Sequence, residues 1–326
     1  MVRIFKNYNP FAVLSLLMLC VIAKIGFMGA PMGSLVQDGQ YLWSNIITGI
    51  QQHIGISPIF LTVLMIVMTF GQALYLNGIF TKYDLLPSMS YLPAMTYVLL
   101  TSLLPEWSQV SLFLVLNWLL LAILDKTIKL YLSQDSRKDL INIGLLAAVV
   151  VLFHTNLALL VLGTVISLLV LRPFRLADFV ALIIGLLVPL YFLAAYWYLV
   201  DELHQFKNIF QLQLGWPLTI VNKPLTFTSL GVAFLFMLLG FAYLSVYLNR
   251  IVVQTKKYWS VALICFWMLT FAAISNITEN FACLLIVLPL LALIITPIWF
   301  ESNKKWLTIV YTLLMIIPLI YVQYIA

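Results

Sequence analysis

Residues 11–57 read FAVLSLLMLCVIAKIGFMGA and then PMGSLVQDGQYLWSNIITGIQQHIGIS. The first part is apolar and long enough to cross the ~30 Å hydrocarbon core of a bilayer as a helix. The second part is more polar, and its apolar residues recur at three- and four-residue spacing, which predicts an amphipathic helix over about 40–54. That apolar stripe consists of Leu42, Trp43, Ile46, Ile47, Ile50 and Ile54. Because such a helix is too polar to span, we expect it to lie in the membrane interface.

The composition extends this interpretation to the whole chain of 326 residues. Hydrophobic residues make up 64% and charged residues 9%, against roughly 45–50% and 25% in a soluble domain, and the mean hydropathy is +1.09. We therefore expect an all-α, polytopic membrane helix bundle that forms one integral membrane domain over 1–326, with membrane lipid as its surroundings. The net charge of +6 indicates no nucleic-acid partner, because the basic residues lie in short loops between apolar segments.

The sequence predicts about eleven transmembrane helices, each near the length that a bilayer requires. Their expected ranges are 11–30, 57–76, 87–104, 108–124, 140–154, 156–171, 176–199, 227–248, 258–275, 281–298 and 306–325. The fifth and sixth are joined through Phe153–Asn156 and form either two crossings or a re-entrant pair.

Charge sorting predicts the orientation of the bundle. With the N-terminus on the cytoplasmic side, all of the 17 lysines and arginines except Lys24, Lys207 and Lys223 fall in or beside cytoplasmic loops, as the positive-inside rule requires. The C-terminus is then outside. The histidines and several carboxylates also fall on the outer side; they are His53, His154, His204, Asp38, Glu106, Asp201, Glu202 and Glu279. Any chemistry is therefore expected at the outer face.

Asp38 and Lys24 lie in or near the first span, and each of them has both a functional and a structural interpretation. Asp38 is either a general base or metal-binding carboxylate at the mouth of a cavity, or a solvated residue of an Asp-Gly turn. Lys24 lies inside the first span, where a cation costs roughly 2.5–3.5 kcal/mol at the bilayer centre. It either faces inward, where it holds a phosphate or pairs with Asp38, or extends to the outer surface.

The other candidates are weaker individually. His154 lies in a very short outer turn, and Glu279 lies in another, so each either lines a polar cavity or completes a hydrogen-bonded turn. Asp201, Glu202 and His204 have no recognisable metal-ligand spacing. The three cysteines, Cys20, Cys265 and Cys283, lie in apolar segments and are expected to be packed and free. Walker, His-Glu-Xaa-Xaa-His and paired-cysteine motifs are absent from the sequence.

The layout resembles the GT-C superfamily of membrane glycosyltransferases. Gln37-Asp38-Gly39-Gln40-Tyr41 lies where that superfamily has a first-loop acid followed by an aromatic residue, and 276–289, NITENFACLLIVLP, is similar to one of its late spans. The chain also resembles a family of inner-membrane proteins of the Bacteroidota, which implies no activity. The GT-C resemblance implies a polyprenyl-phosphate-linked sugar donor and transfer on the periplasmic face of a bacterial inner membrane.

This resemblance implies roles for particular residues. Asp38 would be catalytic, as the base or as the ligand of a divalent cation, which is the only cofactor expected. The residues expected to bind substrate are Lys24, His53, His154, Asp201, Glu202, His204, Lys207 and Glu279. The first loop has one acid where many members have a pair, which keeps two alternatives open. One is a non-catalytic GT-C-like subunit that binds protein partners in an envelope assembly, and the other is a lipid or glycolipid transporter.

Overall fold

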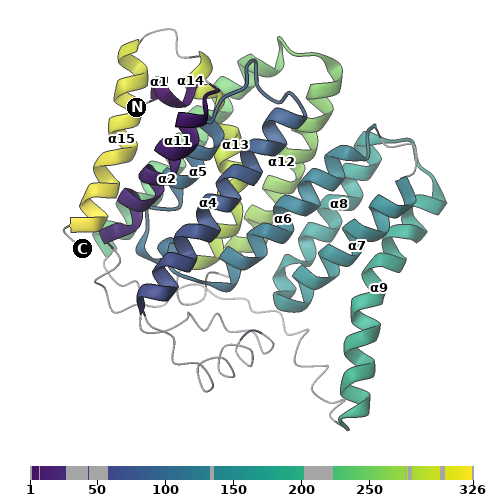
Figure 1. The fold of residues 1–326 in the computed structure, drawn as a ribbon. Coiled ribbons are helices and arrows are strands. Elements are labelled where there is room, and N and C mark those ends of the chain that lie inside the picture. The colour runs from purple at the N-terminus through teal and green to yellow at the C-terminus, as the bar shows by residue number, and fades with distance from the viewer. Residues whose placement is uncertain are drawn as a thin grey trace.

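The computed structural model describes residues 2–6, 8–26, 43, 58–132, 136–201, 223–275, 277, 281–301 and 305–324. Within these ranges the chain forms helices and short connections and no strand, which confirms the all-α prediction (Figure 1). The α-helices are α1 Val2–Lys6, α2 Pro10–Ile25, α4 Pro58–Lys82, α5 Leu92–Leu100, α6 Leu112–Lys129, α7 Ser136–Phe153, α8 Ala158–Leu171, α9 Leu176–Leu199, α11 Lys223–Leu248, α12 Val253–Ile274, α13 Leu288–Ile295, α14 Pro297–Glu301 and α15 Lys305–Tyr324. Three short 3-10 helices are η2 Pro105–Ser108, η3 Thr155–Leu157 and η5 Phe281–Val287.

Five helical segments of the described chain are long and apolar enough to cross a membrane. They are Ile59–Lys82, Leu176–Leu199, Pro224–Leu248, Val253–Ile274 and Phe281–Phe300. The protein is therefore an integral membrane protein by the length and composition of its helices. The full count of about eleven crossings stays a prediction.

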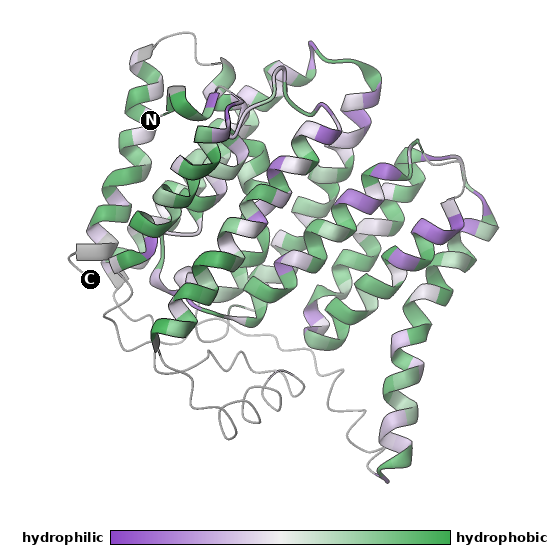
Figure 2. Ribbon diagram, in the orientation of Figure 1, coloured by the Kyte–Doolittle hydropathy of each residue, from purple (hydrophilic) through white to green (hydrophobic). Residues whose placement is uncertain are grey.

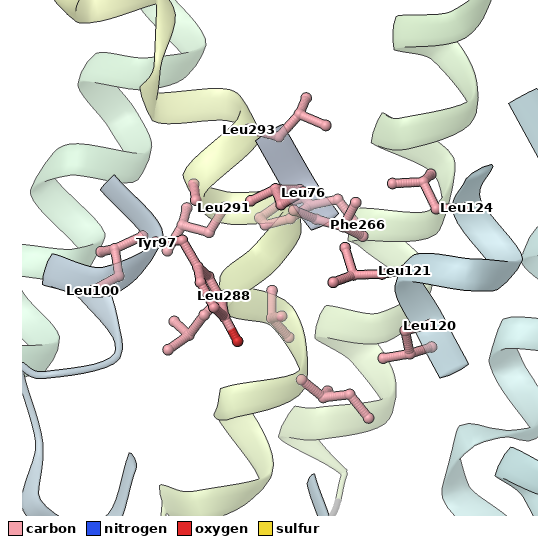
Figure 3. Packing of buried hydrophobic residues seen from close by; sticks show 14 of the residues in the cluster. Leu76, Tyr97, Leu100, Leu120, Leu121, Leu124, Phe266, Leu288, Leu291 and Leu293 are labelled. Atoms are coloured by element: carbon pink, nitrogen blue, oxygen red, sulfur yellow. The ribbon is translucent and has the colours of Figure 1, made fainter. Parts of the chain in front are cut away.

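The centre of the bundle is the segment Phe281–Phe300. Its most apolar stretch of 18 residues is 94% buried. It contains η5 and α13, which pack against α5, α11 and α12. Figure 3 shows Leu288, Leu291 and Leu293 among side chains of the surrounding helices, including Leu121 and Phe266. A helix that is apolar on every side is buried on every side, and this segment fits that rule.

Lipid-facing surfaces lie on the peripheral helices. Exposed large apolar side chains include Phe11 on α2, Phe192 and Leu199 on α9, Phe234 on α11 and Ile317 on α15. Figure 2 shows that the helices are mainly hydrophobic and that strongly hydrophilic residues gather toward one end of the bundle. Extended apolar surface of this kind is rare on soluble proteins and is typical of contact with lipid.

The central segment is interrupted, although the sequence predicted a plain span over 281–298. Pro289 lies in the first turn of α13 and has no N–H to donate to the carbonyl of residue 285 four positions earlier. Asn117 of α6 supplies the donor instead, since its Nδ2 donates to the Leu285 carbonyl oxygen at 3.1 Å. A neighbouring helix thus satisfies the backbone group that proline frees, as a membrane interior requires.

The expected span over 87–104 also differs from a plain helix. α5 has only nine residues, and all of them are buried. The chain then turns through Thr101–Leu104 into η2, which begins at Pro105. The fifth and sixth spans correspond to α7 and to η3 with α8, which are joined at His154. α7 has 18 residues and so extends about 27 Å, which is close to the thickness of a bilayer core.

Candidate functional site

Lys24 lies in the last turn of α2 and is fully buried, with 0% of its surface exposed. Its Nζ donates to the backbone oxygen of Thr101 and to Oγ of Ser108, each at 3.4 Å. The side chain therefore does not extend to the surface. Among the described residues, no carboxylate forms an ion pair with it.

The two acceptors of Lys24 are neutral and already in use. Thr101 is the C-cap residue that follows α5, and Ser108 is the last residue of η2. Ser108 Oγ also donates to the Thr101 oxygen, at 3.2 Å, so one carbonyl serves two donors. An ammonium group has three donors, and two long bonds to neutral oxygens leave capacity for a stronger, anionic acceptor.

A chain of buried polar side chains connects α4, α5, α6 and η5. Tyr97 OH donates to Oε1 of Gln72 at 2.7 Å, and Gln72 Nε2 donates to the Leu114 oxygen at 2.6 Å. Asn117 Nδ2 donates to Tyr97 OH at 3.4 Å as well as to Leu285. Its Oδ1 is buried without a hydrogen-bond partner. An unpaired polar atom is costly inside a membrane protein, so the bonds of Asn117 Nδ2 to Tyr97 and Leu285 are made at the expense of its Oδ1.

η2 also holds the start of the central segment. Glu106 Oε2 accepts from the backbone N–H of Phe281 at 2.6 Å, and Trp107 Nε1 donates to the Phe281 oxygen at 2.9 Å. Both backbone groups of one residue are thus satisfied by consecutive side chains. Burial raises the pKa of the Glu106 carboxyl above its ordinary value, and the hydrogen bond from Phe281 opposes that shift only in part.

His154 lies elsewhere, in the turn between α7 and α8. It is buried, and its ring meets the Phe113 ring edge-on with 5.2 Å between centroids. Burial lowers the pKa of His154 to about 4, so the imidazole is neutral at physiological pH. In the same turn, Asn156 Nδ2 donates to Ser275 Oγ at 3.5 Å.

Asp201 is exposed directly after α9, with a positive φ of 57°. α9 packs mainly against α7, and Figure 1 shows it on the opposite flank of the bundle from α2. The structure therefore does not bring Asp201 close to Lys24. The predicted site residues Asp38, His53, Glu202, His204, Lys207 and Glu279 lie outside the described residues. So does the predicted interfacial helix over 40–54, except Trp43, which is helical and packs partly buried against the core.

Several residues that form the Lys24 cluster, meaning Lys24 with Thr101 and Ser108, and the neighbouring polar chain of Gln72, Tyr97 and Asn117 were not predicted as site residues. Gln72 and Asn117 are amides inside expected spans, and intramembrane amides usually bond to a neighbouring helix; that signal was available in the sequence. Ser108 and Thr101 had none, because their position depends on how α5 ends. No group of three His, Cys, Asp or Glu residues that could hold a metal ion exists among the described residues, and Asp38, the expected ligand of a divalent cation, lies outside them.

Comparison with known proteins identifies no relative: no family model, no curated protein and no solved structure matches the chain.

Proposed function

We propose that the protein is a membrane transferase that takes a sugar from a polyprenyl-phosphate carrier, with Lys24 binding the phosphate. The observation that carries this proposal is the fully buried Lys24 ammonium, which has only neutral acceptors among the described residues. Intramembrane cations are rare and usually face a partner or a substrate path. A phosphate monoanion or dianion is the partner that would compensate this charge best.

The proposed transfer is a displacement at the anomeric carbon of the donor sugar. The acceptor hydroxyl oxygen forms a bond to that carbon while the carbon–oxygen bond to the polyprenyl phosphate breaks. The phosphate leaves with the bonding electron pair, and Lys24 stabilises its developing negative charge. The hydroxyl proton passes to the carboxylate of Asp38, which we propose as the base. The proposal includes about eleven crossings, a cytoplasmic N-terminus and a site on the periplasmic side of an inner membrane.

Lys24→Met tests the proposal with two readouts. In nanodiscs, the wild-type protein should bind polyprenyl phosphate but not the uncharged polyprenol, and Lys24→Met should lose that preference. Turnover of a labelled polyprenyl-phosphate sugar should fall by about 100-fold, the usual effect of removing one donor to a developing charge. The variant should still fold, because a cation inside a span is costly and methionine, an unbranched apolar side chain, adapts to the space that lysine leaves.

Lys256→Met is the matched control, since Lys256 is exposed at the start of α12. It should bind and turn over substrate like the wild type. Asp38→Asn should keep phosphate binding and lose turnover. Equal binding of polyprenyl phosphate by Lys24→Met and wild type would show that Lys24 does not bind the phosphate. That result would also contradict the proposed transferase function.

A second function is favoured by the two interrupted segments, α5 with η2 and η5 with α13, which contact each other at the centre of the bundle. Discontinuous helices that meet within the membrane are common at the binding sites of transporters. A lipid or glycolipid transporter would move a labelled polyprenyl-linked sugar between the leaflets of proteoliposomes without breaking its sugar–phosphate bond. Transfer to an acceptor without such movement favours the enzyme.

A further inference from the structure

The loop that follows α4 contains a carboxylate in an unfavourable position. The Leu85 N–H donates to the Phe80 oxygen at 3.1 Å, the bond of a Schellman motif, and Asp84 occupies the left-handed position with φ 48°. Glycine is the usual residue there, because it alone has no Cβ penalty at positive φ. Aspartate at this position therefore costs stability relative to glycine.

The charge of Asp84 is also unfavourable at this end of the helix. The last carbonyl groups of α4 carry partial negative charge, so a carboxylate beside them is repelled and a cation is attracted. None of the ion pairs among the described residues includes Asp84. The adjacent Lys82 pairs with Asp125 instead, at 2.7 Å, and Tyr83 OH donates to the same carboxylate at 2.8 Å. Asp84 is exposed, so its carboxylate is accessible to a dissolved or lipid-borne cation.

Asp84 lines a small cavity together with three hydroxyl residues. The lining residues are Phe80, Thr81, Asp84, Leu86, Ser88, Met89 and Ser90. Ser90 is 3% exposed, and its Oγ has no hydrogen-bond partner. Thr81 Oγ1 donates to the Asn77 oxygen at 2.9 Å, which leaves its lone pairs available. The cavity has room for a guest about the size of one water molecule.

We propose that this cavity binds a small monovalent cation through the Asp84 carboxylate and the hydroxyl oxygens of Ser90, Ser88 and Thr81. Oxygen atoms are the ligands that hard cations prefer, and a single carboxylate balances a single positive charge. The helix end adds to the attraction. The guest is either a free alkali metal ion or the primary ammonium of an ethanolamine lipid. A quaternary ammonium group has no N–H to donate to these oxygens and is disfavoured.

Thermal unfolding of the purified protein tests this site. In detergent at constant ionic strength, NaCl or KCl should raise the unfolding midpoint saturably, by about 2–4 °C, relative to N-methyl-D-glucamine chloride. Asp84→Asn, which keeps a side chain suited to positive φ, should abolish the difference, and Ser90→Ala should reduce it. Asp201→Asn is the control, because Asp201 also has a positive φ after a helix and should leave the salt response unchanged.

A second experiment, in which the lipid is varied, distinguishes a free alkali ion from a lipid ammonium group. In nanodiscs without alkali ions, ethanolamine lipid should stabilise the wild type over choline lipid if the ammonium head is the guest. A response to salts alone assigns a free ion. Equal midpoints in all three salts and both lipids, or an undiminished response in Asp84→Asn, would overturn the proposal.

Discussion

At the scale of single residues, Lys24 shows where sequence reasoning stops. Its position inside an apolar span is visible in the sequence, and so is the choice between facing inward and extending to the surface. Its burial is decided by Thr101 and Ser108, which come from the turn after α5 some eighty residues later. No local pattern predicts where that short helix ends. The direction in which the Lys24 side chain points could therefore be seen only in the structure.

Glu106 provides a residue-scale prediction about pH. Because burial raises the pKa of Glu106 in the folded protein, the folded state binds its proton more tightly than the unfolded state does. Stability from this group is then fully present below the unfolded pKa of about 4.3 and is lost as pH rises through the raised folded pKa. Glu106→Gln keeps a carbonyl oxygen for the Phe281 N–H and does not titrate. Thermal unfolding from pH 4 upward should therefore show the variant gaining stability relative to the wild type.

Asp125→Asn, which removes a carboxylate that is paired with Lys82, is the control for the loss of one negative charge. Parallel pH profiles for Glu106→Gln and the wild type would show that the Glu106 carboxyl titrates alike in the folded and unfolded states.

At the scale of elements, long uniform helices were predictable and interrupted ones were not. α9, α11 and α12 follow their expected spans because each is a long, predominantly apolar run. η5 and α13 depart from the expectation because Pro289 removes one donor and Asn117 of another helix replaces it. Proline in a span does not by itself predict a break, since α9 continues through Pro189 and α15 through Pro318, and the residue that compensates for Pro289 lies in a different element.

The packing of α7 on α9 gives an element-scale prediction. These two helices form the most extensive contact between elements of the described chain. Gly144 and Gly185 lie at their crossing, where a Cβ on Gly185 would collide with the Ile141 carbonyl and one on Gly144 with the Leu182 carbonyl. Close approach through small residues is a usual basis of helix association in membranes. Gly185→Ala should therefore lower the free energy of unfolding by about 1–3 kcal/mol, measured by denaturant titration in detergent.

Gly78 supplies the comparison, because a Cβ there would meet no atom within 4 Å. Gly78→Ala, in the interior of α4, should be neutral or stabilising by up to about 1 kcal/mol, since alanine favours helix more than glycine does. If both substitutions destabilise the protein equally, the loss belongs to glycine in general and not to the α7–α9 crossing.

At the scale of the whole molecule, composition alone predicted the class. The apolar helices, their lipid-facing side chains and the gathering of hydrophilic residues toward one end agree with a polytopic membrane protein (Figure 2). The candidate site was less predictable, because it depends on tertiary contacts between α2, η2 and the central segment. Of the predicted site residues in the described chain, the structure places Lys24 in this cluster and His154 and Asp201 in separate places.

The orientation of the bundle is the last prediction, and α9 alone tests it. This helix has 24 residues and so extends about 36 Å, enough to cross a ~30 Å core. Arg175 before it and Asp201 after it are both exposed, and the native cysteines Cys20, Cys265 and Cys283 are buried, so their background labelling should be low. In intact cells, a membrane-impermeant maleimide should label Asp201→Cys and should label Arg175→Cys only after permeabilisation. Labelling of both from the same side would show that α9 does not cross, and the reverse pattern would invert the topology and move Lys24 to the cytoplasmic half of the membrane.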